Sequence, residues 1–466
     1  MKKALILLLF LLPASLMWLS CGASAPSGST QTSGLKYRAF LTNSVSSGSG
    51  AAGVFIVNAV TDVRPIISPI SVGNTPGMMV VTPNRAQTVV FSGNGTQFSD
   101  NQLSLVNNAS EAVAKKLTLP GLTESFVVSP DSSSVYVAVP TAPVVGQSPG
   151  ILDAISLSSG TVTGEVEVPS VHYLSIDNSG NRILGFSDVL ASLASPCDPT
   201  PSFLFVVTPS KVGIDPCPAV PVPGVNYPFD HPVAAFFSSD DTTAYVINCG
   251  AECGGTQASV QKLEMTTAQC QPDGVCAPVP VPASSVALFN GSTVYLAGTP
   301  YSAGGGPSLL CSTGTTTTQA TFCGLLTVFD LSSMSVINTA PIVITDGYHN
   351  RIALGANGQL FIGARTCTEI TTATETRGCL SIYNTLPATT VGSVLPGGVL
   401  IPSANGDVTG IQPIATRTVV YVVQNFSLSV YDATIDALEY NPNDPNNPGQ
   451  ILNLIGQFVD VKTVDF

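Results

Sequence analysis

Short apolar runs alternate with short polar turns over most of the chain. One unit recurs: an apolar run, then a turn of small, Pro, Asp, Asn or Gly residues, then a second run rich in β-branched and aromatic residues, as in VVSPDSSSVYVA at 127–138. Short runs of this kind between such turns are typical of β-strands in an all-β fold. The seven units lie at 80–93, 127–138, 175–187, 236–249, 287–298, 353–364 and 411–425.

Each unit is followed by a further run with strand composition, which predicts a third strand. These runs cover 102–109, 151–159, 203–209, 260–266, 325–333, 380–385 and 428–434. A more polar fourth run follows in places, at 112–121 and 161–170. The turns recur about every 50 to 60 residues, slightly more than in simple propeller repeats, which indicates four-stranded blades with inserted loops.

The two ends of the chain complete this pattern. Residues 37–43 have the pattern of a second strand without its first, and 458–466 that of a first strand without its second. Their pairing would build one further blade and leave no free sheet edge. We therefore predict a single all-β propeller over 35–466, with eight four-stranded blades closed by pairing of the N- and C-terminal strands. Seven blades are the alternative.

These repeats resemble the YVTN family of β-propeller repeats, whose unit joins an S-P-D-G turn to a V-Y-V-A-N strand. The local matches are 127–138, 245–248 and 428–432. The resemblance extends over 35–466 and implies the propeller fold and an extracytoplasmic setting. It implies no particular activity, because one fold supports many functions.

The N-terminal segment predicts export and a lipid anchor. Residues 1–20 join a short basic start to an apolar stretch that is too short to span a bilayer comfortably, as in a signal peptide. The sequence around Cys21 resembles a bacterial lipoprotein cleavage box, and 21–34 has the composition of a flexible tether. An ordinary secretory signal is the alternative. Gly22 is not the Asp that retains some lipoproteins at the inner membrane, so we expect contact with the outer membrane through the lipid.

Ten cysteines remain after Cys21, and they fall into five pairs of sequence neighbours. An even set in an exported chain predicts disulfides, and the spacing does not fit a zinc finger or ribbon. The expected pairs are Cys197 with Cys217, Cys249 with Cys253, Cys270 with Cys276, Cys311 with Cys323, and Cys367 with Cys379. The four cysteines from Cys249 to Cys276 could also exchange partners.

Charge and composition narrow the classes of partner and chemistry. The chain has 16 Lys and Arg against 29 Asp and Glu, a net charge of −13, which argues against a nucleic-acid partner. Its one Trp, Trp18, lies in the predicted signal, which argues against WD repeats and against quinone-cofactor and sialidase-type propellers. The chain has no glycine loop followed by a phosphate-binding Lys. We expect a monomer.

The three histidines share one position in the repeat. His172, His231 and His349 each lie at the predicted start of an innermost strand. These starts surround the mouth of a propeller channel, so we expect a ligand site there, with a transition metal as one candidate occupant. Further candidates at equivalent positions are Glu124, Asp230, Asp346 and Arg351. The alternative is that these residues are polar lining of an exposed mouth.

The sequence favours a non-enzymatic role. We expect a binding or scaffolding module at the cell envelope, with a protein, peptide or glycan ligand on one propeller face. The alternative is a metal-binding protein or lactonase-like hydrolase with its site at the histidine-bearing mouth. Catalytic residues are not identified, and no cofactor is expected apart from that candidate metal.

Overall fold

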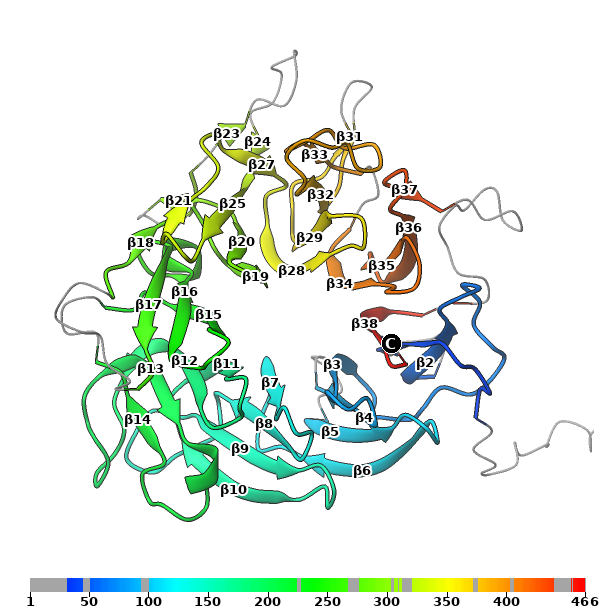
Figure 1. Ribbon diagram of the computed structural model, residues 1–466. Helices are drawn as coiled ribbons and strands as arrows, with labels where there is room; N and C mark the ends of the chain where they lie inside the picture. The colour runs from blue at the N-terminus through cyan, green and yellow to red at the C-terminus, as the bar shows by residue number, and fades with distance from the viewer. Residues whose placement is uncertain are drawn as a thin grey trace, which may run out of the picture.

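Eight sheets are arranged radially around one axis in the part of the chain that the computed structural model describes (Figure 1). That part comprises residues 32–44, 51–93, 100–223, 228–266, 276–302, 306–308, 310–311, 321–371, 376–402, 406–439, 454 and 456–465. The prediction of an eight-bladed propeller is confirmed. The predicted signal peptide and Cys21 lie outside the described residues.

The blades follow one another along the chain, and each runs from an innermost to an outermost strand. Blade 1 contains β38 (Phe458–Thr463), β1 (Arg38–Asn43) and β2 (Gly53–Asn58). Blade 2 contains β3 (Pro76–Val81), β4 (Gln87–Ser92), β5 (Gln102–Asn107) and β6 (Ala112–Thr118), and blade 3 contains β7 (Ser125–Val128), β8 (Ser134–Val139), β9 (Ile151–Ser156) and β10 (Val162–Glu167). Blade 4 contains β11 (Val171–Ile176), β12 (Ile183–Ala191), β13 (Ser202–Val207) and β14 (Ala219–Pro221), and blade 5 contains β15 (Pro232–Phe237), β16 (Thr243–Asn248), β17 (Ser259–Glu264) and β18 (Val279–Pro280).

The remaining blades carry the longer insertions. Blade 6 contains β19 (Val286–Asn290), β20 (Thr293–Gly298), β25 (Gly324–Asp330), β26 (Ser335–Val336) and β27 (Ile342–Ile344). Blade 7 contains β28 (Tyr348–Leu354), β29 (Gln359–Arg365), β32 (Leu380–Asn384) and β33 (Val399–Leu400), and blade 8 contains β34 (Val408–Pro413), β35 (Val419–Gln424), β36 (Ser427–Asp432) and β37 (Ala437–Leu438). Short hairpins pair β21 (Tyr301–Ser302) with β22 (Gly306–Pro307), β23 (Leu310–Cys311) with β24 (Thr321–Phe322), and β30 (Ile370–Thr371) with β31 (Thr376–Arg377). Two short 3₁₀ helices, η1 (Pro209–Lys211) and η2 (Gly250–Cys253), complete the described elements.

The core lies between neighbouring blades. A strand that packs against another sheet on both faces needs an unbroken apolar run rather than an alternating one. The second strands have this character: β35, with the sequence VVYVVQ, is buried at every position. Between blades 8 and 1 the packed side chains include Leu41, Phe55, Tyr421 and Phe458. The apolar runs read from the sequence are therefore the layers that hold one blade to the next.

The ring closes where the two ends of the chain pair. β38 lies antiparallel to β1, with Ala39 opposite Thr463 and Leu41 opposite Val461. Arg38 reinforces the joint, because its guanidinium forms ion pairs with Glu111 of blade 2 at 2.8 Å and with Asp465 at 2.6 Å. The predicted closure is confirmed. The sequence analysis had not identified β2, which pairs along the other edge of β1.

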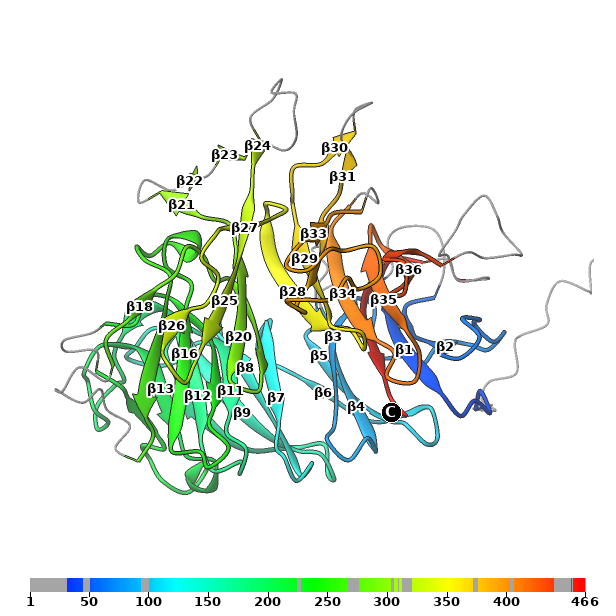
Figure 2. The same ribbon diagram turned by 45° about the horizontal axis from the view of Figure 1, so that its top comes forward.

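The ring has two faces, which we name by the direction of the innermost strands. The upper face is the one where each innermost strand begins and each second strand ends, and the lower face is its opposite. In Figure 2 the hairpins β23–β24 and β30–β31 stand on the upper face, and the C-terminus lies at the lower face. No helix in the described part of the chain is long and apolar enough to cross a membrane.

Candidate functional site

A charged cluster lies at the upper mouth of the channel, centred on His172 of β11. The His172 Nδ1 atom lies 3.4 Å from a carboxylate oxygen of Glu124, and Nε2 lies 3.1 Å from one of Asp188. Glu124 directly precedes β7 of blade 3, and Asp188 belongs to β12 of blade 4. The antiparallel pairing of β11 with β12 places Val171 opposite Ser187, which brings Asp188 beside the ring. We call these three residues the mouth cluster.

The mouth cluster is open to solvent and negatively charged. The side chain of His172 is 24% exposed, whereas those of Glu124 and Asp188 are 59% and 49% exposed. The hydrogen bond to Glu124 raises the pKa of His172, although burial acts in the opposite direction. The same bond lowers the pKa of Glu124. Two carboxylates against one imidazole leave a net negative charge whether or not the ring is protonated.

Two tyrosines meet beside this cluster. The hydroxyl groups of Tyr173 in β11 and Tyr348 in β28 lie 3.3 Å apart, so blades 4 and 7 are in contact at the mouth. Burial raises the pKa of Tyr173, which keeps its hydroxyl protonated. Tyr348 is 39% exposed. The pair therefore places two hydroxyl groups near the carboxylates of the mouth cluster.

His231 lies in a different environment, directly before β15. Its Nδ1 atom lies 3.1 Å from one oxygen of Asp230, and its ring centroid lies 5.0 Å from that of Phe203. The other Asp230 oxygen accepts hydrogen bonds from the backbone amides of Thr256 and Gln257, each at 2.8 Å. Burial would raise the pKa of Asp230, but these hydrogen bonds outweigh it and lower the pKa. Asp230 thus fixes the loop that follows η2.

His349 of β28 is enclosed completely. Its exposed fraction is 0%, and neither ring nitrogen has a hydrogen-bond partner. A Cβ atom at Gly324 of blade 6 would lie 2.7 Å from the Cε1 atom of this ring. Burial lowers the pKa of His349 to about 4. This histidine is therefore a neutral member of the interface between blades 6 and 7.

Asp346 and Arg351, the two remaining residues of the predicted site, bind backbone groups of neighbouring segments. Asp346 is buried, and its carboxylate accepts hydrogen bonds from the amide and hydroxyl of Thr368 at 2.8 and 2.6 Å. Arg351 donates from Nε to the Thr409 carbonyl at 2.7 Å, which joins blade 7 to blade 8. Both side chains hold the inner wall of the ring together.

The structure therefore brings His172 to Glu124 and His231 to Asp230, but not the three imidazoles to one point. In the described part of the chain, one group of three His, Cys, Asp or Glu residues has ligand atoms within 4.8 Å of one another: Cys367, Glu369 and Cys379. Its two sulfur atoms are bonded to each other, so they are not free thiolates. Metal binding by the three histidines remains a prediction. In the described residues their ring nitrogens do not lie close enough together to coordinate one ion.

Disulfides tie several of the loops that connect the strands. The predicted pairs Cys197–Cys217, Cys249–Cys253 and Cys367–Cys379 are confirmed. Cys323 is also disulfide-bonded, while the side chain of its predicted partner Cys311 lies outside the described part. Cys270 also lies outside it, so its pairing with Cys276 remains a prediction.

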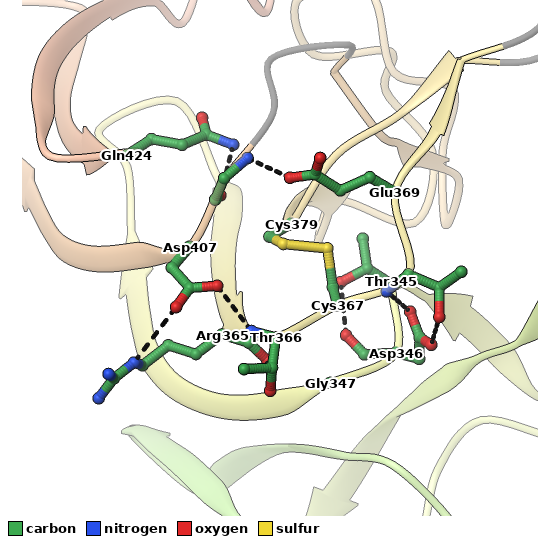
Figure 3. The surroundings of a disulfide bond; sticks show 12 residues. Thr345, Asp346, Gly347, Arg365, Thr366, Cys367, Glu369, Cys379, Asp407 and Gln424 are labelled. Atoms are coloured by element: carbon green, nitrogen blue, oxygen red, sulfur yellow. Dashed lines mark hydrogen bonds and ion pairs between the residues drawn. A yellow bond between two sulfur atoms is a disulfide. The ribbon is translucent and has the colours of Figure 1, made fainter.

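Figure 3 shows the surroundings of Cys367–Cys379. This disulfide joins the segment after β29 to the start of β32. Beside it, Asp407 of the neighbouring blade accepts a hydrogen bond from the Thr366 amide at 2.7 Å, and Glu369 accepts one from the Gly406 amide. The disulfide thus fixes the upper loops of blade 7, and hydrogen bonds join these loops to blade 8.

Sequence reasoning did not identify Asp188 as a member of the site. It lies in a second strand rather than at the start of an innermost one, so the repeat position that singled out the histidines does not include it. The one available signal is the length of β12, which runs nine residues and ends in an exposed segment.

Comparisons with known proteins identify the fold. No protein-family model matches the chain, and no curated protein matches it. Among solved structures, hydrazine synthase of Kuenenia stuttgartiensis is similar at 12% identity over 80% of this chain and 100% of that one, with a TM-score of 0.50. The dihydro-heme d1 dehydrogenase NirN, solved in complex with DHE, is similar at 13% identity over 92% of this chain and 76% of that one, with a TM-score of 0.51. At these identities the likeness concerns the propeller fold alone.

Proposed function

We propose that this protein is a YVTN-type propeller anchored at the cell envelope, and that its upper face binds a basic segment of a protein or peptide. The mouth cluster is the observation that carries the proposal. Glu124 and Asp188 come from two blades and flank His172 with about half of each carboxylate side chain exposed. A ligand ammonium or guanidinium group would add the positive charge that the cluster lacks.

The surroundings of His172 favour recognition over catalysis. A histidine that activates a nucleophile keeps one ring nitrogen on the hydroxyl or thiol and the other on an orienting group. Here both nitrogens face carboxylates. The neighbouring hydroxyl groups of Tyr173 and Tyr348 are directed at each other, 3.3 Å apart. They can orient a polar ligand without taking part in a reaction.

The position of the tether supports the same role. Ser33, at the end of the predicted tether, hydrogen-bonds through its backbone amide and its hydroxyl to Glu111. Glu111 also binds Arg38 at the start of β1, which is at the lower face. A lipid on Cys21 would therefore hold the lower face toward the membrane. The mouth cluster would point away from it, accessible to a partner.

Fluorescence anisotropy with a labelled penta-lysine peptide, and a penta-glutamine peptide as the neutral probe, tests the proposal. The Glu124→Gln/Asp188→Asn variant should bind the lysine peptide about tenfold more weakly, which corresponds to about 1.4 kcal/mol. The matched control is Glu167→Gln/Glu264→Gln, which removes the same charge from two strands away from the mouth. Equal affinity of both variants for penta-lysine would overturn the proposal, as would equal binding of the two peptides.

A further inference from the structure

A second site lies on the upper face, in a pocket of about 330 Å³ between blades 5 and 6. The segment after β16, the segment before β19 and the segment after β20 surround it, and it shares no residue with the mouth cluster. Much of its wall is apolar: Ala258, Pro282, Ala283, Pro300 and Leu325. The polar wall includes Glu252, Thr256 and Tyr301.

Glu252 is held in the pocket wall by fixed contacts. It lies in η2, whose ends are tied by the Cys249–Cys253 disulfide. One carboxyl oxygen accepts a hydrogen bond from the Ser285 hydroxyl and the other accepts one from the Thr299 amide, each at 3.0 Å. A Cβ atom at Gly298 would lie 2.6 Å from the Glu252 Oε2 atom, so a glycine is needed for this close approach. The carboxyl group therefore has one defined position.

The described residues provide no counter-ion for this carboxyl group. In the described part of the chain no cationic side chain forms an ion pair with Glu252, and burial raises its pKa to about 8. The facing groups add no positive charge either. Burial and then the charges of Glu252 and Asp346 raise the pKa of Tyr301. On the other side of η2, His231 is already engaged by Asp230.

We propose that this pocket binds a primary alkylammonium group, with Glu252 as its counter-ion. The apolar walls suit a chain of methylene groups such as the stem of a lysine side chain, and the fixed carboxylate suits a terminal ammonium. Tyr301 and Thr256 also line the pocket. The Thr256 hydroxyl donates its proton to Asp230 at 2.6 Å, so its oxygen is left to accept from an N–H donor. The occupant is a lysine side chain of a peptide or a free alkylamine, because both present this group.

Binding in this form is coupled to proton release. The ammonium pairs with the ionised carboxylate, so the Glu252 proton passes to the buffer while the amine keeps its own. With a pKa of about 8 for Glu252, the ionised fraction rises about tenfold between pH 7 and pH 9. The affinity for an alkylammonium ion should rise by the same factor, since a primary amine with a pKa of about 10.4 stays charged over that range.

Isothermal titration calorimetry with n-pentylamine and with Nα-acetyl-lysine amide tests the proposal and separates the two sources of the group. The expected result is binding with net proton release, measured in two buffers of different ionisation enthalpy, and about tenfold tighter binding at pH 9 than at pH 7. n-Pentanol and the Nε-acetylated lysine derivative should not bind. Binding of n-pentylamine alone would assign the pocket to free amines, and tight binding of the lysine derivative would assign it to lysine side chains.

Glu252→Gln is the decisive variant. A glutamine can still accept from the Thr299 amide and bind the Ser285 hydroxyl, so the fold is kept while the charge is lost. We expect this variant to lose amine binding, whereas Glu264→Gln and the mouth variant Glu124→Gln/Asp188→Asn keep it. Amine binding unchanged in Glu252→Gln, or binding without proton release in the unaltered protein, would overturn the proposal. Unchanged penta-lysine affinity in the mouth variant would overturn the mouth proposal and leave amine binding at Glu252 intact. Unchanged amine binding in Glu252→Gln would overturn the pocket proposal and leave the mouth result intact, so the two proposals fail separately.

Discussion

Burial of His349 should make the protein sensitive to acid. The ring is fully enclosed between blades 6 and 7. Burial opposes its protonation, and it outweighs the Thr345 backbone and the Asp346 carboxylate, which favour the charged ring. Its pKa is about 4 in the folded protein, against about 6.5 in an unfolded chain. Because the pKa is lower in the folded protein than in the unfolded chain, protonation of His349 costs no stability above about pH 6.5. Stability is lost progressively as the pH falls toward 4.

The size of the effect follows from these two pKa values. Between pH 7 and pH 4.5 the histidine should remove about 2.5 kcal/mol from the free energy of unfolding. A His349→Leu variant has a side chain of similar volume and no titrating group at this position. Its free energy of unfolding should therefore fall by about 2.5 kcal/mol less than that of the unaltered protein between pH 7 and pH 4.5. At pH 7 it should be more stable than the unaltered protein by about 1 kcal/mol, since it buries no unsatisfied nitrogen.

Urea unfolding, followed by near-UV circular dichroism of the tyrosines with the disulfides kept oxidised, measures the free energy of unfolding. It gives both the loss of stability between pH 7 and pH 4.5 and the difference between the two proteins at pH 7. His172→Gln is the control, because that ring is partly exposed and lies between two carboxylates. The His172→Gln variant should therefore lose stability toward acid pH at least as steeply as the unaltered protein. If the unaltered protein and His349→Leu lose stability in parallel between pH 7 and pH 4.5, the reasoning from burial is refuted.

Three further outcomes follow from contacts described above. Arg38→Met leaves two buried carboxylates without their cation and should lower the free energy of unfolding by about 3 kcal/mol in urea titrations; an unchanged midpoint would contradict this. Deletion of residues 458–466 removes the innermost strand of blade 1 and should yield aggregates in size-exclusion chromatography, whereas a stable monomer would show that closure is dispensable. Loss of the Cys367–Cys379 disulfide by double serine substitution should cost about 2–3 kcal/mol, and equal thermal midpoints with and without the bond would exclude a stabilising role.

The sequence predicted the ring well because its signals are local. Each hairpin needs only an apolar run, a turn and a second run, and the seven predicted turns are the connections between innermost and second strands. The pairing of 37–43 with 458–466 was predictable because each end lacked one strand of the unit. The missed strand β2 has an apolar sequence, GVFIVN, and pairs with β1, but this run was not assigned to any unit from the sequence.

The site was less predictable because it depends on side-chain direction. The register is irregular at the start of all three histidine-bearing segments: between Val171 and Tyr173, between Pro232 and Ala234, and between His349 and Arg351. A bulge turns the local strand and redirects its side chains. His172 lies within the register shift of its strand, whereas His349 is paired with Ala364 before the shift of its own, so one ring lies at the mouth and the other in a blade interface. Spacing along the chain does not contain this information.

The joint between β1 and β38 also decides how the molecule bears load. The chain from a lipid on Cys21 would reach the ring at β1, a strand that is paired along both of its edges. A pull on the tether then acts along β1, so several hydrogen bonds of two ladders resist it together rather than breaking one after another. The salt bridges of Arg38 to two other segments add to this resistance. With such an anchor, β1, the strand that pairs with the C-terminal strand, would also be the mechanical attachment point of the ring.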